Sequence, residues 1–337
     1  MAQALYRLLR EREALAEIDV VAPAWSLPIL DRMEEVHRAV ELPIAHGQAG
    51  LAKRYAVGRS LRAERYSHAI VLPRSWKSAL VPYFAHVPIR TGFRGEFRYG
   101  LINDMRAYDA KRLDQTVKRF IALGLDAGER VLPPTLVPRL RVEVQAQANT
   151  LERLGLPRAP DVVALLPGAE YGSAKQWPAE HFAELAARLA RVGVDVWILG
   201  STKERPLGES ICAAAAHPGV RNLCGETTLA EAVDLLGATR VAVSNDSGLM
   251  HVAAAVGTYV VALYGSSSPL MTPPLTDRKR VFHLDLDCSP CFQRECPLGH
   301  LRCLRDISVD DVCSVAVTVL GEPRFEHDLE AGHGPPV

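Results

Sequence analysis

The stretch RVAVSNDSGLMH, residues 240–251, contains the strand-to-helix transition on which the fold of this chain depends. Its apolar run at 240–244 predicts a buried strand, and the segment 246–256 predicts a helix. The same alternation surrounds it, with strands expected at 162–166, 194–199, 220–223 and 259–264 and helices at 178–191, 203–215 and 228–237. Strands that alternate with helices in this way predict a parallel sheet covered on both faces.

The first part of the chain shows a second set of alternating elements. Helices are expected at 2–14, 27–34, 50–64 and 75–84, and strands at 18–22, 36–42 and 68–72. The proline-containing segment 129–140 predicts a linker. We therefore expect an α/β chain of two Rossmann-like, doubly wound domains, 1–135 and 136–337, with a cleft between them. Because the first domain opens in a helix, we expect its sheet to lack its first, central strand and that strand's loop.

Overall composition excludes several classes of protein. The chain has 337 residues, with 39 Lys+Arg and 39 Asp+Glu, so its net charge is zero. A dedicated nucleic-acid binder carries a basic excess. No apolar run reaches the roughly 18 residues of a membrane span, and the charged first helix is not a secretory signal. We expect a cytoplasmic protein.

Three expected strand-to-helix loops carry candidate ligand-binding residues. In SNDSGLMH (244–251) a helix N-terminus offers free N–H groups to a diphosphate, Asp246 offers a carboxylate to a sugar hydroxyl, and His251 follows one turn later. The alternative is a purely structural role, in which Asp246 or Ser247 caps the helix and His251 packs in the core. In PGAEYGSAKQWP (167–178) Lys175 is either a phosphate ligand or a solvated lysine. In LCGETTL (223–229) Glu226 either grips ribose hydroxyls or caps a helix.

Basic residues gather in two stretches of the first domain, LPRSWKSA (72–79) and RTGFRGEFR (90–98). They offer cations to an anionic acceptor, the alternative being a solvated basic face. The candidates are Arg74, Lys77, Arg90, Arg94 and Arg98. Neither a GxGxxG pattern nor a P-loop occurs, which disfavours dinucleotide oxidoreduction and P-loop ATP hydrolysis.

Four of the seven cysteines lie within sixteen residues, in CSPCFQRECPLGHLRC (288–303). Cys288, Cys291, Cys296 and Cys303, or three of them with His300, form a candidate structural zinc site, because clustered thiols in a reducing compartment favour a metal over disulfides. The alternative is a set of reduced cysteines that pack a short loop.

Taken together, these motifs resemble the ADP-heptose:lipopolysaccharide heptosyltransferases of glycosyltransferase family 9. The resemblance rests on SNDSGLMH, VALYGSSSP (261–269), PGAEYGSAKQWP and RTGFRGEFRYGLIND (90–104), and it extends to about residue 320. It implies the GT-B fold and an inverting transfer that requires no cofactor. The donor would be ADP-L-glycero-D-manno-heptose, and the acceptor would be the first heptose of the Kdo-lipid A inner core.

The resemblance also assigns residues. It implies that Lys175 contacts phosphate, that Asp246, Ser247, Gly248 and His251 bind the donor, and that Glu226 binds the ribose. Lys77 and the arginines at 90, 94 and 98 would bind the acceptor. The family's general-base Asp follows the first strand, and no residue here matches it. Asp104 and Glu96 are the substitutes that the sequence offers.

Two other functions compete with this interpretation. One is a chain that binds donor without turnover, and the other is a different GT-B nucleotide-sugar enzyme, such as an epimerase or a hydrolase. A lipid acceptor would place the protein peripherally at the cytoplasmic face of the inner membrane. The candidate contact for anionic headgroups is a basic surface on the expected helix 50–64 and its end, formed by Lys53, Arg54, Arg59, Arg62 and Arg65.

Overall fold

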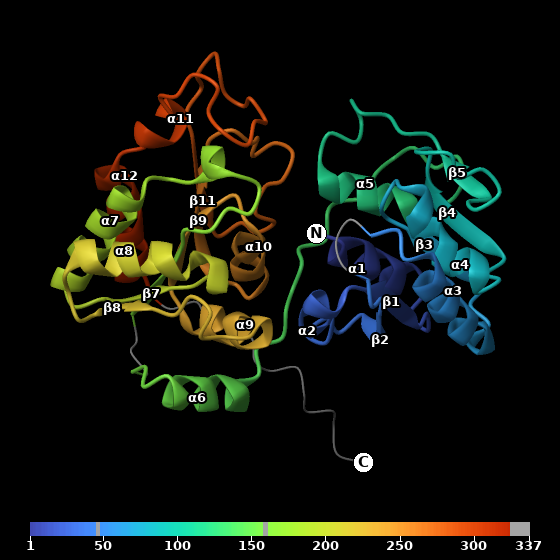
Figure 1. The fold of residues 1–337 in the computed structure, drawn as a ribbon, viewed down its shortest axis with the longest axis horizontal. Helices are drawn as coiled ribbons and strands as arrows, with labels where there is room; N and C mark the ends of the chain where they lie inside the picture. The colour runs from blue at the N-terminus through green and yellow to red at the C-terminus, as the bar shows by residue number, and fades with distance from the viewer. Residues whose placement is uncertain (45–47, 158–160, 324–337) are drawn as a thin grey trace. The chain divides into compact units, whose positions relative to one another are not determined.

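Residues 1–44, 48–157 and 161–323 are described by the computed structural model, and they fall into two units (Figure 1). The N-terminal unit comprises Met1–Arg141 with Leu270–Thr272, and the C-terminal unit comprises Val142–Pro269 with Pro273–Val337. The division thus falls after Arg141, within an irregular stretch, whereas the sequence suggested residue 135. No local pattern indicates that Leu270–Thr272 belongs with the first unit.

Within its described residues, the C-terminal unit contains one sheet of six parallel strands. The strands are β6 (Val162–Leu166), β7 (Asp195–Ile198), β8 (Val220–Asn222), β9 (Val241–Asn245), β10 (Tyr259–Tyr264) and β11 (Lys279–His283). The α-helices are α6 (Val144–Arg153), α7 (Ala179–Arg191), α8 (Arg205–Ala215), α9 (Leu229–Ala238), α10 (Gly248–Ala255), α11 (Arg302–Arg305) and α12 (Val309–Gly321). The sequence located β6 and β10 to the residue, but it gave no indication of β11 or the helices at the two ends of this unit.

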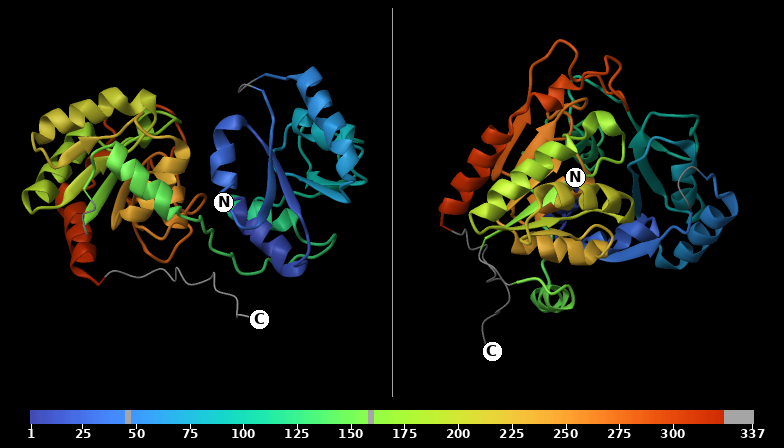
Figure 2. Two further views of the ribbon diagram at one scale, coloured as in Figure 1. Left: turned by 90° about the horizontal axis from the view of Figure 1, so that it is seen from below. Right: turned by 60° about the vertical axis from the view of Figure 1, so that its left-hand side comes forward.

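Helices cover both faces of this sheet, as Figure 2 shows. One face packs against α7, α8 and α12 through alternate strand residues such as Val163 and Val241, which are register partners. On the other side α10 packs against β9, β10 and α9. Every residue of β6 is buried, which is why its sequence is a continuous apolar run rather than an alternating one.

Strand order places the functional edge of this sheet. The order is β11-β10-β9-β6-β7-β8, so the chain leaves β6 toward β7 and β8 and later returns to the other side of β6 with β9. The direction of winding therefore changes between β6 and β9. In open α/β sheets, ligands bind beyond the carboxyl ends of the strands at such a switch point. The loops that follow β6 and β9 contain the donor candidates Lys175 and Asp246.

The described residues of the N-terminal unit form five strands in two parallel sheets, β1-β2 and β3-β4-β5. The strands are β1 (Ile18–Ala22), β2 (Val36–Glu41), β3 (His68–Val71), β4 (Ile89–Phe93) and β5 (Asp104–Arg106). The α-helices are α1 (Gln3–Arg12), α2 (Leu27–Leu30), α3 (Leu51–Ser60), α4 (Leu80–Phe84) and α5 (Thr116–Leu123). The sequence suggested a sheet that lacks its first, central strand; the described strands form two separate sheets.

Short 3₁₀ helices extend several of these elements. They are η1 (Ala24–Ser26), η2 (Leu61–Glu64), η3 (Trp76–Ala79), η4 (Ser173–Lys175) and η5 (Thr202–Glu204). η2 completes the helix expected at 50–64, and η3 with α4 fills the one expected at 75–84. The basic stretch 90–98, for which the sequence suggested no secondary structure, begins within strand β4.

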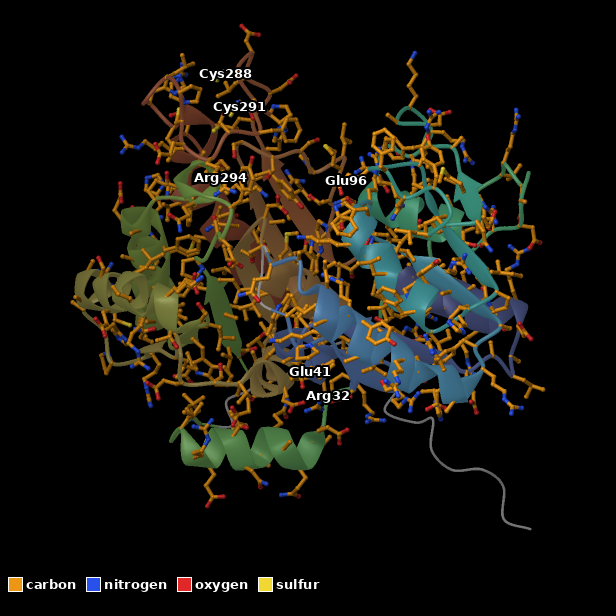
Figure 3. All side chains as sticks on the ribbon, turned by 45° about the vertical axis from the view of Figure 1, so that its right-hand side comes forward. Arg32, Glu41, Glu96, Cys288, Cys291 and Arg294 are labelled. Atoms are coloured by element: carbon orange, nitrogen blue, oxygen red, sulfur yellow. The ribbon has the colours of Figure 1, made fainter. Side chains whose placement is uncertain are left out.

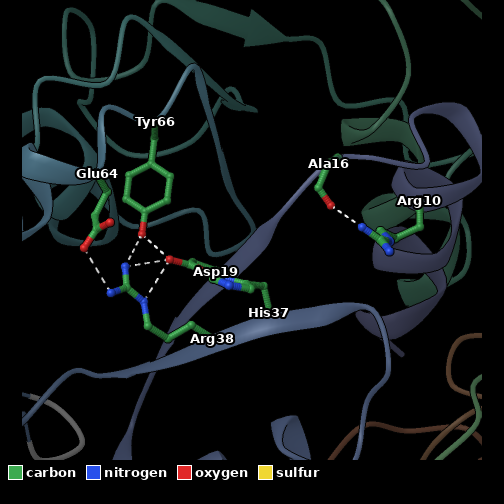
Figure 4. Close-up of polar contacts among 7 residues, drawn as sticks. All are labelled: Arg10, Ala16, Asp19, His37, Arg38, Glu64 and Tyr66. Atoms are coloured by element: carbon green, nitrogen blue, oxygen red, sulfur yellow. Dashed lines mark hydrogen bonds and ion pairs between the residues drawn. The ribbon is translucent and has the colours of Figure 1, made fainter.

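A buried carboxylate joins the two sheets of the N-terminal unit (Figure 4). Asp19 of β1 accepts hydrogen bonds from Arg38 of β2, at 2.7 Å and 3.0 Å, and from the Tyr66 hydroxyl, which precedes β3. His37 Nδ1 lies 3.0 Å from the same carboxylate. Burial alone would raise the pKa of Asp19, but the hydrogen bonds from Tyr66, His37 and Arg38 outweigh it and lower the pKa.

Membrane-spanning segments were sought among the helices of the described ranges. None of these helices is both long enough and apolar enough to cross a bilayer.

Candidate functional site

A buried asparagine connects the two loops at the switch point. The side chain of Asn245, the last residue of β9, is fully buried; its Nδ2 donates to Pro167 O at 2.8 Å and its Oδ1 accepts from Trp177 N at 3.0 Å. Both partners belong to the loop after β6. The sequence motif contained Asn245, but we gave it no role, because an internal loop-to-loop bond has no local signature.

Lys175 and Asp246 meet across these loops. Lys175 ends η4, Asp246 follows β9, and their Nζ and Oδ2 atoms lie 2.5 Å apart. The side chain of Lys175 is 18% exposed and that of Asp246 is 7% exposed. The structure therefore brings together the cation and the carboxylate that the sequence assigned to the donor. The alternative interpretation of Lys175 as a solvated lysine is therefore wrong.

The N-terminus of α10 lies directly after Asp246. Ser247 is its N-cap residue, and its side chain makes no capping hydrogen bond. A Cβ placed on Gly248 would meet no atom within 4 Å, so the packing of the described chain does not require glycine there. Burial lowers the pKa of His251 to about 4, which keeps its ring neutral at pH 7.

Two buried hydroxyls belong to the loop that follows β10. Among the described residues, Ser266 Oγ and Ser267 Oγ have no hydrogen-bond partner. Buried polar groups normally have partners, and a site for a polar ligand is one explanation when they do not. In the sequence, these serines contribute only to the family resemblance.

Glu226 does not cap a helix. The N-cap of α9 is Thr228, which forms a reciprocal capping box with Glu231, so the capping interpretation that the sequence offered for Glu226 is wrong. Glu226 instead forms a 2.6 Å ion pair with Arg205, the first residue of α8, and both side chains are 41% exposed. Its carboxylate stays accessible to a polar ligand.

The basic residues of the N-terminal unit separate into two groups. The Arg98 side chain is 1% exposed and donates to Pro73 O at 2.7 Å and to Phe93 O. Arg90 donates to the carbonyls of residues 87, 100 and 101. These two guanidinium groups brace their own loops, contrary to the expectation that they face an acceptor. Arg94 is exposed and Lys77 is half-buried, and they remain the candidates for that role.

The two acids that the sequence offered as substitute bases differ in environment. Asp104 is bound by Arg106 at 2.7 Å and by the Thr91 hydroxyl at 2.6 Å. The Arg106 hydrogen bonds are the largest effect that lowers the pKa of Asp104, which disfavours a proton-accepting role. Glu96 is exposed and accepts a hydrogen bond from Trp76 N at 3.0 Å.

The cysteine cluster lies beside the loop after β6. Cys288, Cys291, Cys296 and Cys303 all line one cavity of about 20 Å³, and Ala174, next to Lys175, lines it too. Figure 3 labels Cys288 and Cys291 together with Arg294, which lies in the same loop. The four thiols are free, not disulfide-bonded. A hydrogen bond from the backbone of Leu301 is the largest effect that lowers the pKa of Cys296.

Comparison with known proteins agrees with this geometry. The model of glycosyltransferase family 9 (heptosyltransferase) matches residues 54–302. The chain is 45% identical over 316 residues to lipopolysaccharide heptosyltransferase 2 of Escherichia coli K12, covering 91% of each chain. It is 43% identical to the protein of that name from Salmonella typhimurium, covering 96% of this chain and 95% of the other. The structure of E. coli ADP-heptose lps heptosyltransferase II matches with a TM-score of 0.84 and 42% identity, covering 95% and 94% of the two chains.

The fold and the site therefore define a glycosyltransferase with the GT-B fold. More particularly, the chain belongs to glycosyltransferase family 9, the heptosyltransferases.

Proposed function

We propose that this chain transfers L-glycero-D-manno-heptose, with inversion, from ADP-heptose to the first heptose of the lipopolysaccharide inner core. The observation that carries the proposal is the pairing of Lys175 with Asp246 at the head of α10. Support also comes from relatives that cover nearly the whole chain and are named lipopolysaccharide heptosyltransferase 2, and from a solved structure named as an ADP-heptose lps heptosyltransferase II.

The C-terminal unit supplies the donor site in this proposal. The diphosphate lies against the N–H groups and positive dipole end of α10, where Gly248 leaves room for close approach. Lys175 places its ammonium on a phosphate oxygen, and neutral His251 donates one hydrogen bond. Asp246 accepts from hydroxyls of the heptose, and Glu226 accepts from the ribose.

Developing charge on the leaving diphosphate explains why these groups suit transfer as well as binding. As the glycosidic bond breaks, negative charge grows on ADP, and fixed donors that face it stabilise the transition state more than the ground state. Lys175 and the amides of α10 are such donors, so no metal is needed for this part of the reaction.

The N-terminal unit supplies the acceptor site in this proposal. Lys77 and Arg94 attract the phosphate or carboxylate groups of the inner core. Because the acceptor is a lipid, the protein works as a peripheral protein at the cytoplasmic face of the inner membrane. Of the five basic residues first considered for headgroup contact, Lys53, Arg59 and Arg65 are exposed, whereas Arg54 is buried and donates to Ala49 O at 2.8 Å.

A product assay tests the proposal. The chain is incubated with ADP-heptose and heptosyl-Kdo2-lipid A, and the lipid is analysed by mass spectrometry. We expect the mass of one added heptose, and we expect this product to fall with Lys175→Met. A chain that binds ADP but adds no heptose to this lipid would contradict the proposed transfer and leave only donor binding.

A further inference from the structure

The segment 288–303, here called the cysteine loop, contacts the loop after β6 (167–178), which contains Lys175 and is here called the donor loop. Arg294 O accepts from Ala174 N at 3.0 Å, and the Tyr171 hydroxyl donates to Phe292 O at 2.9 Å. The fit is tight at Gly172, where an added Cβ would lie 2.2 Å from Arg294 O. Any constraint on the cysteine loop is therefore transmitted directly to the backbone beside Lys175.

The four cysteines of the loop surround one small space, as the ligands of a thiolate metal site do. They line a single cavity of about 20 Å³, which is enough space for one water-sized occupant. The other three cysteines of the chain, at 212, 224 and 313, do not line it. Four converging thiols in a compact loop match the ligand set that Zn²⁺ and similar soft divalent ions prefer.

Backbone geometry inside the loop favours four sulfur ligands. Leu301 N donates to Cys296 Sγ at 3.4 Å, the kind of contact that stabilises a thiolate. His300 Nδ1 accepts from Arg302 N at 3.0 Å, which leaves the proton of the neutral ring on Nε2. Neither nitrogen of His300 then offers a lone pair to a metal. The set of three cysteines with His300 that the sequence left open is therefore less favoured than four cysteines.

The metal-free arrangement is open. Within the described ranges, no three Cys, His, Asp or Glu side chains are grouped closely enough to hold a metal ion. The thiols thus surround a cavity instead of a closed coordination sphere, and binding requires their sulfurs to move inward. The segments 292–295 and 297–299, on either side of Cys296, are exposed, and surface segments of this kind can move, whereas Cys303 is buried in α11.

We propose that Cys288, Cys291, Cys296 and Cys303 bind one thiophilic divalent cation, with Zn²⁺ as the probe, and that this metal fixes the cysteine loop against the donor loop. Each thiol loses its proton on binding and the cation gains four sulfur ligands, so no oxidant or reductant takes part. The second half of the proposal, support of the donor loop, rests on the proposed function.

Cobalt binding tests the metal site without any use of activity. The full chain is purified, reduced, stripped with a chelator and titrated with Co²⁺, whose thiolate complexes have an intense charge-transfer band. We expect a band that saturates at about one equivalent and disappears when Zn²⁺ is added. Cys296→Ser should reduce the band, whereas Cys313→Ser, a half-buried cysteine of α12 outside the loop, should leave it unchanged. No thiolate band in the reduced wild-type chain, or equal loss in both variants, overturns the site.

Calorimetry with ADP tests the support of the donor loop. We expect the stripped chain to bind ADP about tenfold more weakly than the zinc-loaded chain, with affinity restored by Zn²⁺. Equal ADP affinity with and without zinc overturns the loop-support half while the cobalt result stands. If the zinc-loaded chain binds no ADP at all, the proposed donor site itself fails, and the cobalt experiment still decides the metal site.

Discussion

Lys175 Nζ lies 2.5 Å from Asp246 Oδ2, and this ion pair joins the loop after β6 to the loop after β9. Both side chains are largely shielded from water, so each screens the other's charge and each is costly to leave alone. In the proposed donor site, a diphosphate would compete with Asp246 for Lys175. The two residues should therefore affect nucleotide binding in opposite directions.

The first prediction distinguishes the effects of Lys175 and Asp246 on nucleotide binding. Lys175→Met should weaken ADP binding tenfold or more, because a charge-assisted contact contributes about 1.5–3 kcal/mol. Asp246→Asn should tighten ADP binding, because it removes a negative charge beside the diphosphate, yet it should lower kcat/KM for ADP-heptose. Calorimetry and initial rates measure both effects. Lys203→Met, at an 80% exposed lysine of the same unit, is the control. Weaker ADP binding with Asp246→Asn would contradict the competition.

The second prediction concerns the approach of the ligand to α10. Gly248→Ala should leave the melting temperature within a few degrees of wild type, because the new Cβ meets no atom of the described chain. It should nevertheless weaken ADP binding, because the methyl group occupies the space into which the diphosphate fits. Gly321→Ala, at the last residue of α12, also enters open space and is the matched control. Unchanged ADP affinity with Gly248→Ala would place the diphosphate elsewhere.

The third prediction distinguishes Glu226 from its neighbour Glu231. Glu226→Gln should weaken ADP binding and change stability by less than about 1 kcal/mol, because its ion pair with Arg205 is exposed. Glu231→Gln keeps an acceptor in the capping box but loses the Arg153 ion pair, and it should leave ADP affinity unchanged. Thermal denaturation and calorimetry on both variants test this. Equal effects on ADP binding would remove Glu226 from the ribose site.

The fourth prediction is a pH dependence in the N-terminal unit. Asp19 has a lowered pKa in the folded chain, so the stabilisation it provides is present above its unfolded pKa of about 3.9 and is lost as pH falls through the folded value. Tyr66→Phe removes one hydrogen-bond donor and should lower the melting temperature at pH 7. The difference between wild type and variant should narrow on acidification toward pH 3. A difference that is constant over this range would mean that the Asp19 charge is not involved.

The fifth prediction concerns membrane contact. The chain should sediment with anionic vesicles at low salt and not with neutral ones, and binding should fade at high salt as the charges are screened. Changing Lys53, Arg59 and Arg65 together to Gln should weaken binding. The control is Arg221→Gln with Arg191→Gln, two exposed arginines of the C-terminal unit. Equal recovery in the supernatant with both kinds of vesicle would exclude this surface.

Local sequence patterns were sufficient to predict much of the secondary structure of the C-terminal unit. Runs such as Val162–Leu166 and Tyr259–Tyr264 predicted strands correctly because a strand buried on both faces must be apolar throughout, whatever its neighbours are. The loops after β6 and β9 were recognisable for a similar reason, since glycines, an N-terminal helix turn and a nearby charge have local signatures. The sequence did not indicate strand β4, and it offered Arg90 and Arg98 to the acceptor, whereas both side chains donate to nearby backbone carbonyls.

The sequence by itself determined the α/β class, strands β6 to β10 of the second unit, the resemblance to family 9 and the identity of Lys175 and Asp246 as donor candidates. Tertiary structure alone decided that these two side chains pair, that Asn245 ties their loops, that Arg98 is buried and that four cysteines enclose one cavity. The physical reason is the separation along the sequence of the residues that determine each feature. Strand and helix preferences are set by neighbouring residues, whereas contacts between residues 71 positions apart depend on strand order, which no local pattern specifies.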